Sequence, residues 1–123
     1  MQYLIRLGIP EVEQYWENLT KLVKDNKANK KDIITYNKLG KIFKLIAFNP
    51  LYPGLKTHEI DQLTKRYGYK VFESYVENNK PGAMRVFWVY GPNKNEITII
   101  GIEPHPNDKS NSYKKITLSA TGD

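Results

Sequence analysis

The sequence predicts an α+β domain in which a helical hairpin packs on one face of an antiparallel sheet of three or four strands. Two observations indicate this class. In the first half of the chain, apolar residues recur at three- and four-residue steps, the period of amphipathic helices. In the second half they alternate or form short runs, as in β-strands. The expected order is a short strand, two helices and then the sheet.

The first half contains the predicted hairpin. Residues 2–7 form an apolar run that is typical of a short strand. Pro10 stands where the first residue of a helix belongs, and the apolar spacing predicts that helix over residues 10–24. Asn29 is placed to cap a second helix over residues 30–48. Four apolar side chains are expected to be buried against the sheet: Trp16, Leu19, Ile42 and Ile46.

The second half supplies the sheet. Its main strands are expected at residues 70–77, 83–90 and 96–103. The Gly- and Pro-containing segment 91–95 joins the last two as a hairpin. Residues 52–60 include a shorter strand, residues 61–67 form a turn or one to two helical turns, and residues 113–118 are a candidate last strand.

Length and composition exclude several classes of function. The 123 residues fit one domain, over residues 1–123. The chain has no cysteine, which excludes a disulfide scaffold, a thiol nucleophile and a cysteine-ligated metal. It contains no phosphate-binding GxxxxGK[ST] loop and no GxSxG turn. No apolar run is long enough for a membrane span, and a signal peptide is not recognisable. We therefore expect a cytoplasmic protein without a cofactor or metal.

Positive charge is concentrated in the helical hairpin. The chain carries a net charge of +6, and the segment Lys21–Lys44 accounts for all of it, with eight lysines against Asp25 and Asp32. Such a local basic surface suits a polyanion or an acidic protein. The alternative is a solvated, lysine-rich surface that has no partner.

Arg85 is the most unusual residue of the predicted sheet. It shares a strand face with Phe87, where an arginine is costly unless it is paired or exposed. Glu73 and Tyr75 share a face of the preceding strand, so either can neighbour Arg85. We expect Arg85 outside the core, on the sheet face that the hairpin leaves open.

The two histidines differ in placement. His105 lies between two prolines directly after a strand, which would present its imidazole at a fixed place near Arg85. The alternative is an inert surface histidine. His58 is expected to make a structural hydrogen bond. The two are far apart in the sequence and do not have the spacing of metal ligands.

This order of elements, with these residues, resembles the RelE/ParE superfamily of bacterial type II toxins. The second helix ends at Asn49-Pro50, and Pro53–Lys56 follows, like the family's "NP…pgLk" joint. Arg85 opens a strand like the family's "yRvvy" strand. His105 then follows the next strand, and Tyr113 is the late tyrosine.

The resemblance implies a RelE-like fold, a cognate antitoxin protein as partner, and the ribosome with its mRNA as target. Ribosome-dependent members cleave mRNA without a metal, by attack of a ribose 2′-hydroxyl on the adjacent phosphate. Carried over by position, Arg85 would stabilise the phosphate and Lys56 would contact it. His105 would be a base or an acid, and Glu73 a general base. Tyr113 would orient or stack on a nucleobase. Lys38, Lys41 and Lys44 of the basic segment would contact ribosomal RNA.

A second hypothesis keeps the fold without the chemistry. Some members of the superfamily inhibit DNA gyrase, and a homologue that only binds an antitoxin needs no catalytic residues. A nuclease needs an acid–base pair beside a cation, whereas an inhibitor does not.

Overall fold

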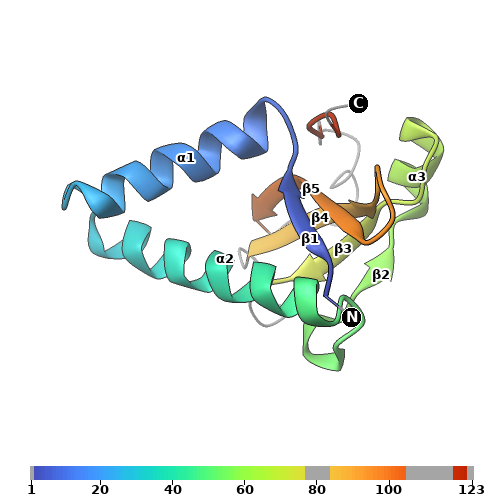
Figure 1. Cartoon of the computed structure of the whole chain (residues 1–123), viewed down its shortest axis with the longest axis horizontal. Coiled ribbons are helices and arrows are strands. Elements are labelled where there is room, and N and C mark those ends of the chain that lie inside the picture. The colour runs from blue at the N-terminus through green and yellow to red at the C-terminus, as the bar shows by residue number, and fades with distance from the viewer. Residues whose placement is uncertain (1, 77–83, 105–117, 122–123) are drawn as a thin grey trace.

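A computed structural model of the chain describes residues 2–76, 84–104 and 118–121 (Figure 1). The elements in chain order are β1 (Leu4–Leu7), α1 (Glu11–Lys24), α2 (Lys30–Phe48), a short 3₁₀ helix (Pro53–Leu55), β2 (His58–Glu59), α3 (Asp61–Tyr67), β3 (Phe72–Tyr75), β4 (Met84–Tyr90) and β5 (Glu96–Pro104). The α+β class is confirmed, and both long helices lie within one residue of their predicted bounds.

The sheet differs from the prediction. It has five strands in the order β1-β5-β4-β3-β2, and it is mixed, because β1 pairs parallel to β5 while the other neighbours are antiparallel. The expected antiparallel sheet of three or four strands is therefore wrong in detail. Local patterns do not reveal a pairing such as Leu4 with Glu96, whose members are so far apart in the sequence.

The helical hairpin covers one face of the sheet. Its two helices run antiparallel, and their connection lies away from the strands (Figure 1). Leu19, Ile42 and Ile46 are buried there, as predicted, in one core cluster with Val86 and Trp88 of β4. Trp16 is only half-buried, so the prediction for this residue is wrong. It packs at the margin of this core, where it stacks on Tyr36.

The opposite face, expected to be open, carries a smaller core. Leu63 of α3 is fully buried there with Phe87, Val71 and Ile100, and Leu118 closes the cluster. Gly68 ends α3 in the left-handed conformation (φ 81°), which glycine adopts without steric cost. Only part of this face is left for functional side chains.

Among the described residues, no helix has the length and apolar character that crossing a membrane requires. The same part of the chain contains no group of three or more His, Asp or Glu side chains placed to hold a metal ion.

A buried ion-pair network and a candidate nucleic-acid interface

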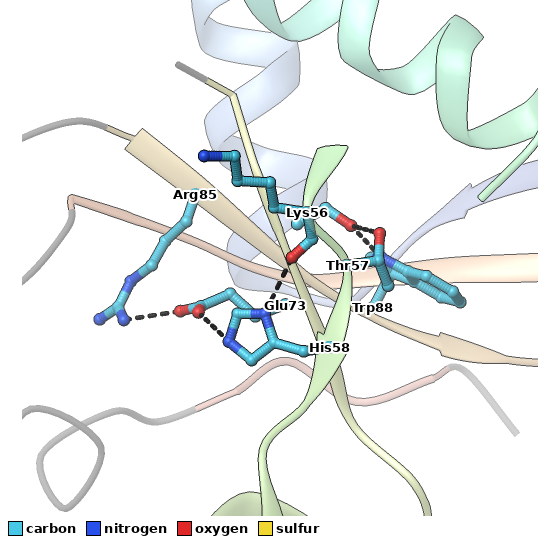
Figure 2. A network of polar contacts seen from close by, with 7 residues as sticks. Lys56, Thr57, His58, Glu73, Arg85 and Trp88 are labelled. Carbon is cyan, nitrogen blue, oxygen red and sulfur yellow. Dashed lines mark hydrogen bonds and ion pairs between the residues drawn. The ribbon is translucent and has the colours of Figure 1, made fainter. Parts of the chain in front are cut away.

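Arg85 is buried in an ion pair with Glu73. Its Nη1 donates to Oε2 of Glu73 at 2.6 Å, and the two side chains are 2% and 0% exposed (Figure 2). The guanidinium also lies over the ring of Phe87, 5.0 Å from its centroid. The expectation of an Arg85 outside the core is therefore wrong. The pairing with a residue of the preceding strand is confirmed, and it is what makes the burial tolerable.

His58 extends the network to the surface. Strand pairing sets His58 beside Glu73, and its Nε2 lies 3.0 Å from Oε1 of that carboxylate. Its Nδ1 lies 2.9 Å from the carbonyl oxygen of Lys56, so both ring nitrogens face an oxygen (Figure 2). The imidazole is 45% exposed. The hydrogen bond expected for His58 is confirmed, but its contact with Glu73 was missed because β2 has only two residues.

Two further ionisable side chains flank Arg85 in the strand register, Tyr75 on β3 and Glu103 on β5. Burial raises the pKa of the Tyr75 phenol; the Glu73 carboxylate raises it further, while Arg85 opposes the shift. Burial also raises the pKa of the Glu103 carboxyl, against the opposing attraction of Arg85. Both groups therefore favour their neutral forms more than in water.

This network offers an exposed imidazole, a buried carboxylate and a buried guanidinium. Because Glu73 accepts from the guanidinium, a phosphate that approached Arg85 would compete with that carboxylate. Lys56 is exposed, and its ammonium points away from the carboxylate in Figure 2. His105 and Tyr113 lie outside the described residues.

A second polar cluster lies on the helix-facing side of the sheet. The Ser74 hydroxyl accepts from the indole of Trp88 at 2.9 Å and lies 2.6 Å from the hydroxyl of Thr57 (Figure 2). The Thr57 hydroxyl also donates to the carbonyl oxygen of Pro50 at 2.8 Å. These bonds tie the segment after α2 to the middle of the sheet. They satisfy buried polar groups and have a structural role.

The basic surface of the hairpin is the other candidate site. All eight lysines between Lys21 and Lys44 are exposed. On α2, Lys38, Lys41 and Lys44 follow each other at three-residue steps, so their side chains lie on neighbouring parts of one helix side. The sequence predicted this surface correctly, because lysine at regular helical spacing opposite an apolar face is exposed.

A groove beside these lysines was not predicted. It lies along α2 and has Trp16, Tyr36 and Phe43 in its walls with Lys41 and Lys44. The signal in the sequence was Trp16, a tryptophan within the apolar stripe of the first helix, which the helical period assigns to the core.

Comparison with known proteins adds two partial similarities. No family model and no solved structure matches the chain. Over 40 residues it is 45% identical to small ribosomal subunit protein uS8 of Geobacillus stearothermophilus, which is 32% of this chain and 30% of that protein. Over 45 residues it is 44% identical to small ribosomal subunit protein uS8 of Geobacillus kaustophilus, which is 37% of this chain and 33% of that protein. The aligned part thus spans about a third of the length of these curated relatives.

Proposed function

We propose that the protein binds RNA through the lysine-rich side of the helical hairpin and associates with the ribosome. The observation that carries this proposal is the exposure of all eight lysines between Lys21 and Lys44. Together with Asp25 and Asp32 they carry the whole net charge of the chain. Clustered lysines neutralise phosphates and release counterions, which is the main source of affinity in sequence-independent binding.

Two lines of support point to the ribosome as the place of action. The partial similarity to small ribosomal subunit protein uS8 concerns a protein of the ribosome. The order of elements, with a helical hairpin ahead of the main strands, supports a RelE-like fold, whose ribosome-dependent members act on mRNA. With that fold, a cognate antitoxin protein is the expected protein partner.

Charge reversal tests the RNA-binding surface. The triple variant Lys38→Glu, Lys41→Glu and Lys44→Glu should weaken binding of purified small ribosomal subunits and of labelled ribosomal RNA fragments by about 10-fold or more. The matched control reverses Lys65, Lys70 and Lys94, which are equally exposed outside the hairpin. Fluorescence anisotropy at several salt concentrations measures both affinity and salt dependence.

Two outcomes would contradict the proposal. One is equal loss of affinity in the hairpin variant and the control variant, which would mean that net charge alone matters. The other is an affinity that does not change between low and high salt, because phosphate contacts weaken steeply with salt. A salt-independent complex would indicate a protein partner held by apolar contacts.

Metal-independent cleavage of mRNA is a second candidate function, favoured by the meeting of His58, Glu73 and Arg85 on one sheet face. In that reaction the ribose 2′-oxygen bonds to the adjacent phosphorus while the bond from phosphorus to the 5′-oxygen breaks. A base takes the proton of the 2′-hydroxyl, and an acid gives one to the leaving oxygen. A 2′,3′-cyclic phosphate and a 5′-hydroxyl are the products.

The proposed roles in cleavage follow the superfamily resemblance. Arg85 would stabilise the charge on the phosphate, with Lys56 as a second contact. His105 would act as a base or an acid and Glu73 as a general base in the proton transfers. Tyr113 would orient or stack on a nucleobase. Because Arg85 donates to Glu73 at 2.6 Å, this mechanism requires the phosphate to replace the carboxylate as a hydrogen-bond acceptor of Arg85.

Inducible expression with primer-extension mapping of mRNA ends separates the candidates. Cuts at fixed codon positions that decrease by about 10²-fold in His105→Ala would support the nuclease. Undiminished cutting in that variant would exclude the mechanism as drawn. Growth arrest with intact mRNA and inhibited DNA supercoiling would instead support a non-enzymatic gyrase inhibitor.

A further inference from the structure

We propose that the groove along α2 binds an unpaired base of single-stranded RNA, with Trp16 as the stacking surface. The inference rests on the proposed RNA binding and assigns part of it to one place. The groove has a volume of about 570 Å³. This is within the range of pockets that hold small molecules.

The aromatic walls of the groove are held in place by contacts with one another. Trp16 stacks on Tyr36 with ring centroids 4.8 Å apart and planes 13° from parallel. Phe43, which is buried, meets Trp16 edge-on at 5.2 Å. Trp16 and Tyr36 remain half-buried, so part of their surface faces the groove. Fixed aromatic faces of this kind stack on any base and do not require a particular sequence.

Charge favours a nucleic acid as the occupant. Lys41 and Lys44 line the groove, and none of the described residues that line it is acidic. On the α1 side of Trp16 a second hollow also contains two lysines, but Glu17 and Asp25 line it with them. The groove along α2 is therefore the one suited to a phosphate backbone, with a base against the indole and phosphates at the two ammonium groups.

Gly40 keeps the floor of the groove open. A Cβ atom added there would have the indole of Trp16 as its nearest neighbour, at 4.0 Å. Glycine in a helix interior lowers stability relative to alanine. A larger side chain at this position would extend into the groove. Such a substitution blocks the site while every lysine and aromatic ring is retained.

The experiment compares wild type with Gly40→Leu, using a labelled 12-nucleotide oligouridylate and a 12-base-pair RNA duplex as probes. Wild-type protein should bind the single strand with quenching of tryptophan fluorescence, which reports on Trp16 because Trp88 is fully buried. Gly40→Leu should raise the Kd for the single strand by about tenfold, the effect of losing one stacked base. Its affinity for the duplex, whose bases are not available for stacking, should stay the same.

The outcomes separate this inference from the proposed function. Single-strand binding that is unchanged in Gly40→Leu overturns the groove site but leaves RNA binding by the hairpin intact. Failure of the wild type to bind either probe overturns both. Circular dichroism verifies that Gly40→Leu is folded. If it is not, the wild-type measurement still decides, because binding of the single strand without quenching of Trp16 contradicts stacking there.

Discussion

Arg85 illustrates how much of a site the identity of one residue reveals. In an apolar strand it had to be paired or exposed, and strand alternation made Glu73 and Tyr75 its possible neighbours on the preceding strand. The structure adds that the ion pair is buried, at 2% and 0% exposure. Burial depends on how other segments pack over that sheet face, which the alternation of a single strand does not encode. Arg85 therefore takes part in the stability of the fold.

Removing one member of the buried pair should destabilise the protein strongly. Glu73→Gln and Arg85→Met each break the buried ion pair, and each should lower the free energy of unfolding by about 3–5 kcal/mol. The double variant should cost less than the sum of the two, because both single substitutions remove the same contact. Urea denaturation of the four proteins measures the coupling. Additive effects would mean that the 2.6 Å contact contributes little to folding.

Glu103 should make a contribution to the free energy of unfolding that decreases as pH rises. Its pKa is raised in the folded protein, because burial penalises the charged form more than Arg85 favours it. The folded state therefore binds the proton more tightly than the unfolded chain does, and this contribution to stability is lost as pH rises from the ordinary glutamate pKa through the raised one.

Glu103→Gln removes this titration. The variant should gain stability relative to wild type as pH rises from 4 to 7, measured by urea denaturation at both values. A wild-type protein that gained stability over Glu103→Gln on going to pH 7 would mean that attraction to Arg85 outweighs burial.

At the scale of elements, the helices and the short strands within residues 2–7 and 52–60 were predictable, but the pairing partners of those strands were not. Helix α2 begins where the sequence predicts because Asn29 and Asp32 form a reciprocal cap: Asn29 Oδ1 accepts from the Asp32 amide at 2.8 Å, and Asp32 Oδ2 accepts from the Asn29 amide at 3.2 Å. Both signals are local. Strand β2 lies within the predicted segment 52–60, but its two-residue pairing with β3 joins distant parts of the chain and has no recognisable local pattern.

Asn29→Ala should shorten or loosen the first turn of α2. It removes the side-chain acceptor of the cap and should lower the free energy of unfolding by about 1 kcal/mol. Asn29→Ser keeps an acceptor at the same place and should retain most of the stability. Thermal unfolding followed by circular dichroism compares the three proteins. An alanine variant as stable as wild type would mean that packing of α2, and not its cap, determines where the helix begins.

At the scale of the whole molecule, contacts between distant segments join residues near the two ends of the chain. Ile9 pairs with Ala120, and the Ser119 hydroxyl accepts from the amide of Val12 at 3.1 Å. With the parallel pairing of β1 and β5, these contacts join the beginning of the hairpin to the last strand. Amphipathic patterning predicts which face of an element is buried, but not which distant segment covers it, and this is why the mixed sheet was missed.

Gly8 is the point where this closure leaves no room for a side chain. A Cβ atom there would lie 2.7 Å from Cβ of Ser119 and 2.9 Å from the carbonyl oxygen of Ile99, closer than such atoms approach. Gly8→Ala should therefore lower the free energy of unfolding by about 1–3 kcal/mol, the usual cost of overpacking.

The same substitution at Gly40 is the matched control, and it should act in the opposite direction. Alanine there lies in a helix with its nearest neighbour at 4.0 Å, so it should raise the free energy of unfolding by about 0.5–1 kcal/mol. Urea denaturation of both variants tests the pair together. Equal stability of Gly8→Ala and wild type would show that residues 118–121 yield to a methyl group, and that their contacts with residues 8–12 do not hold the two segments rigidly together.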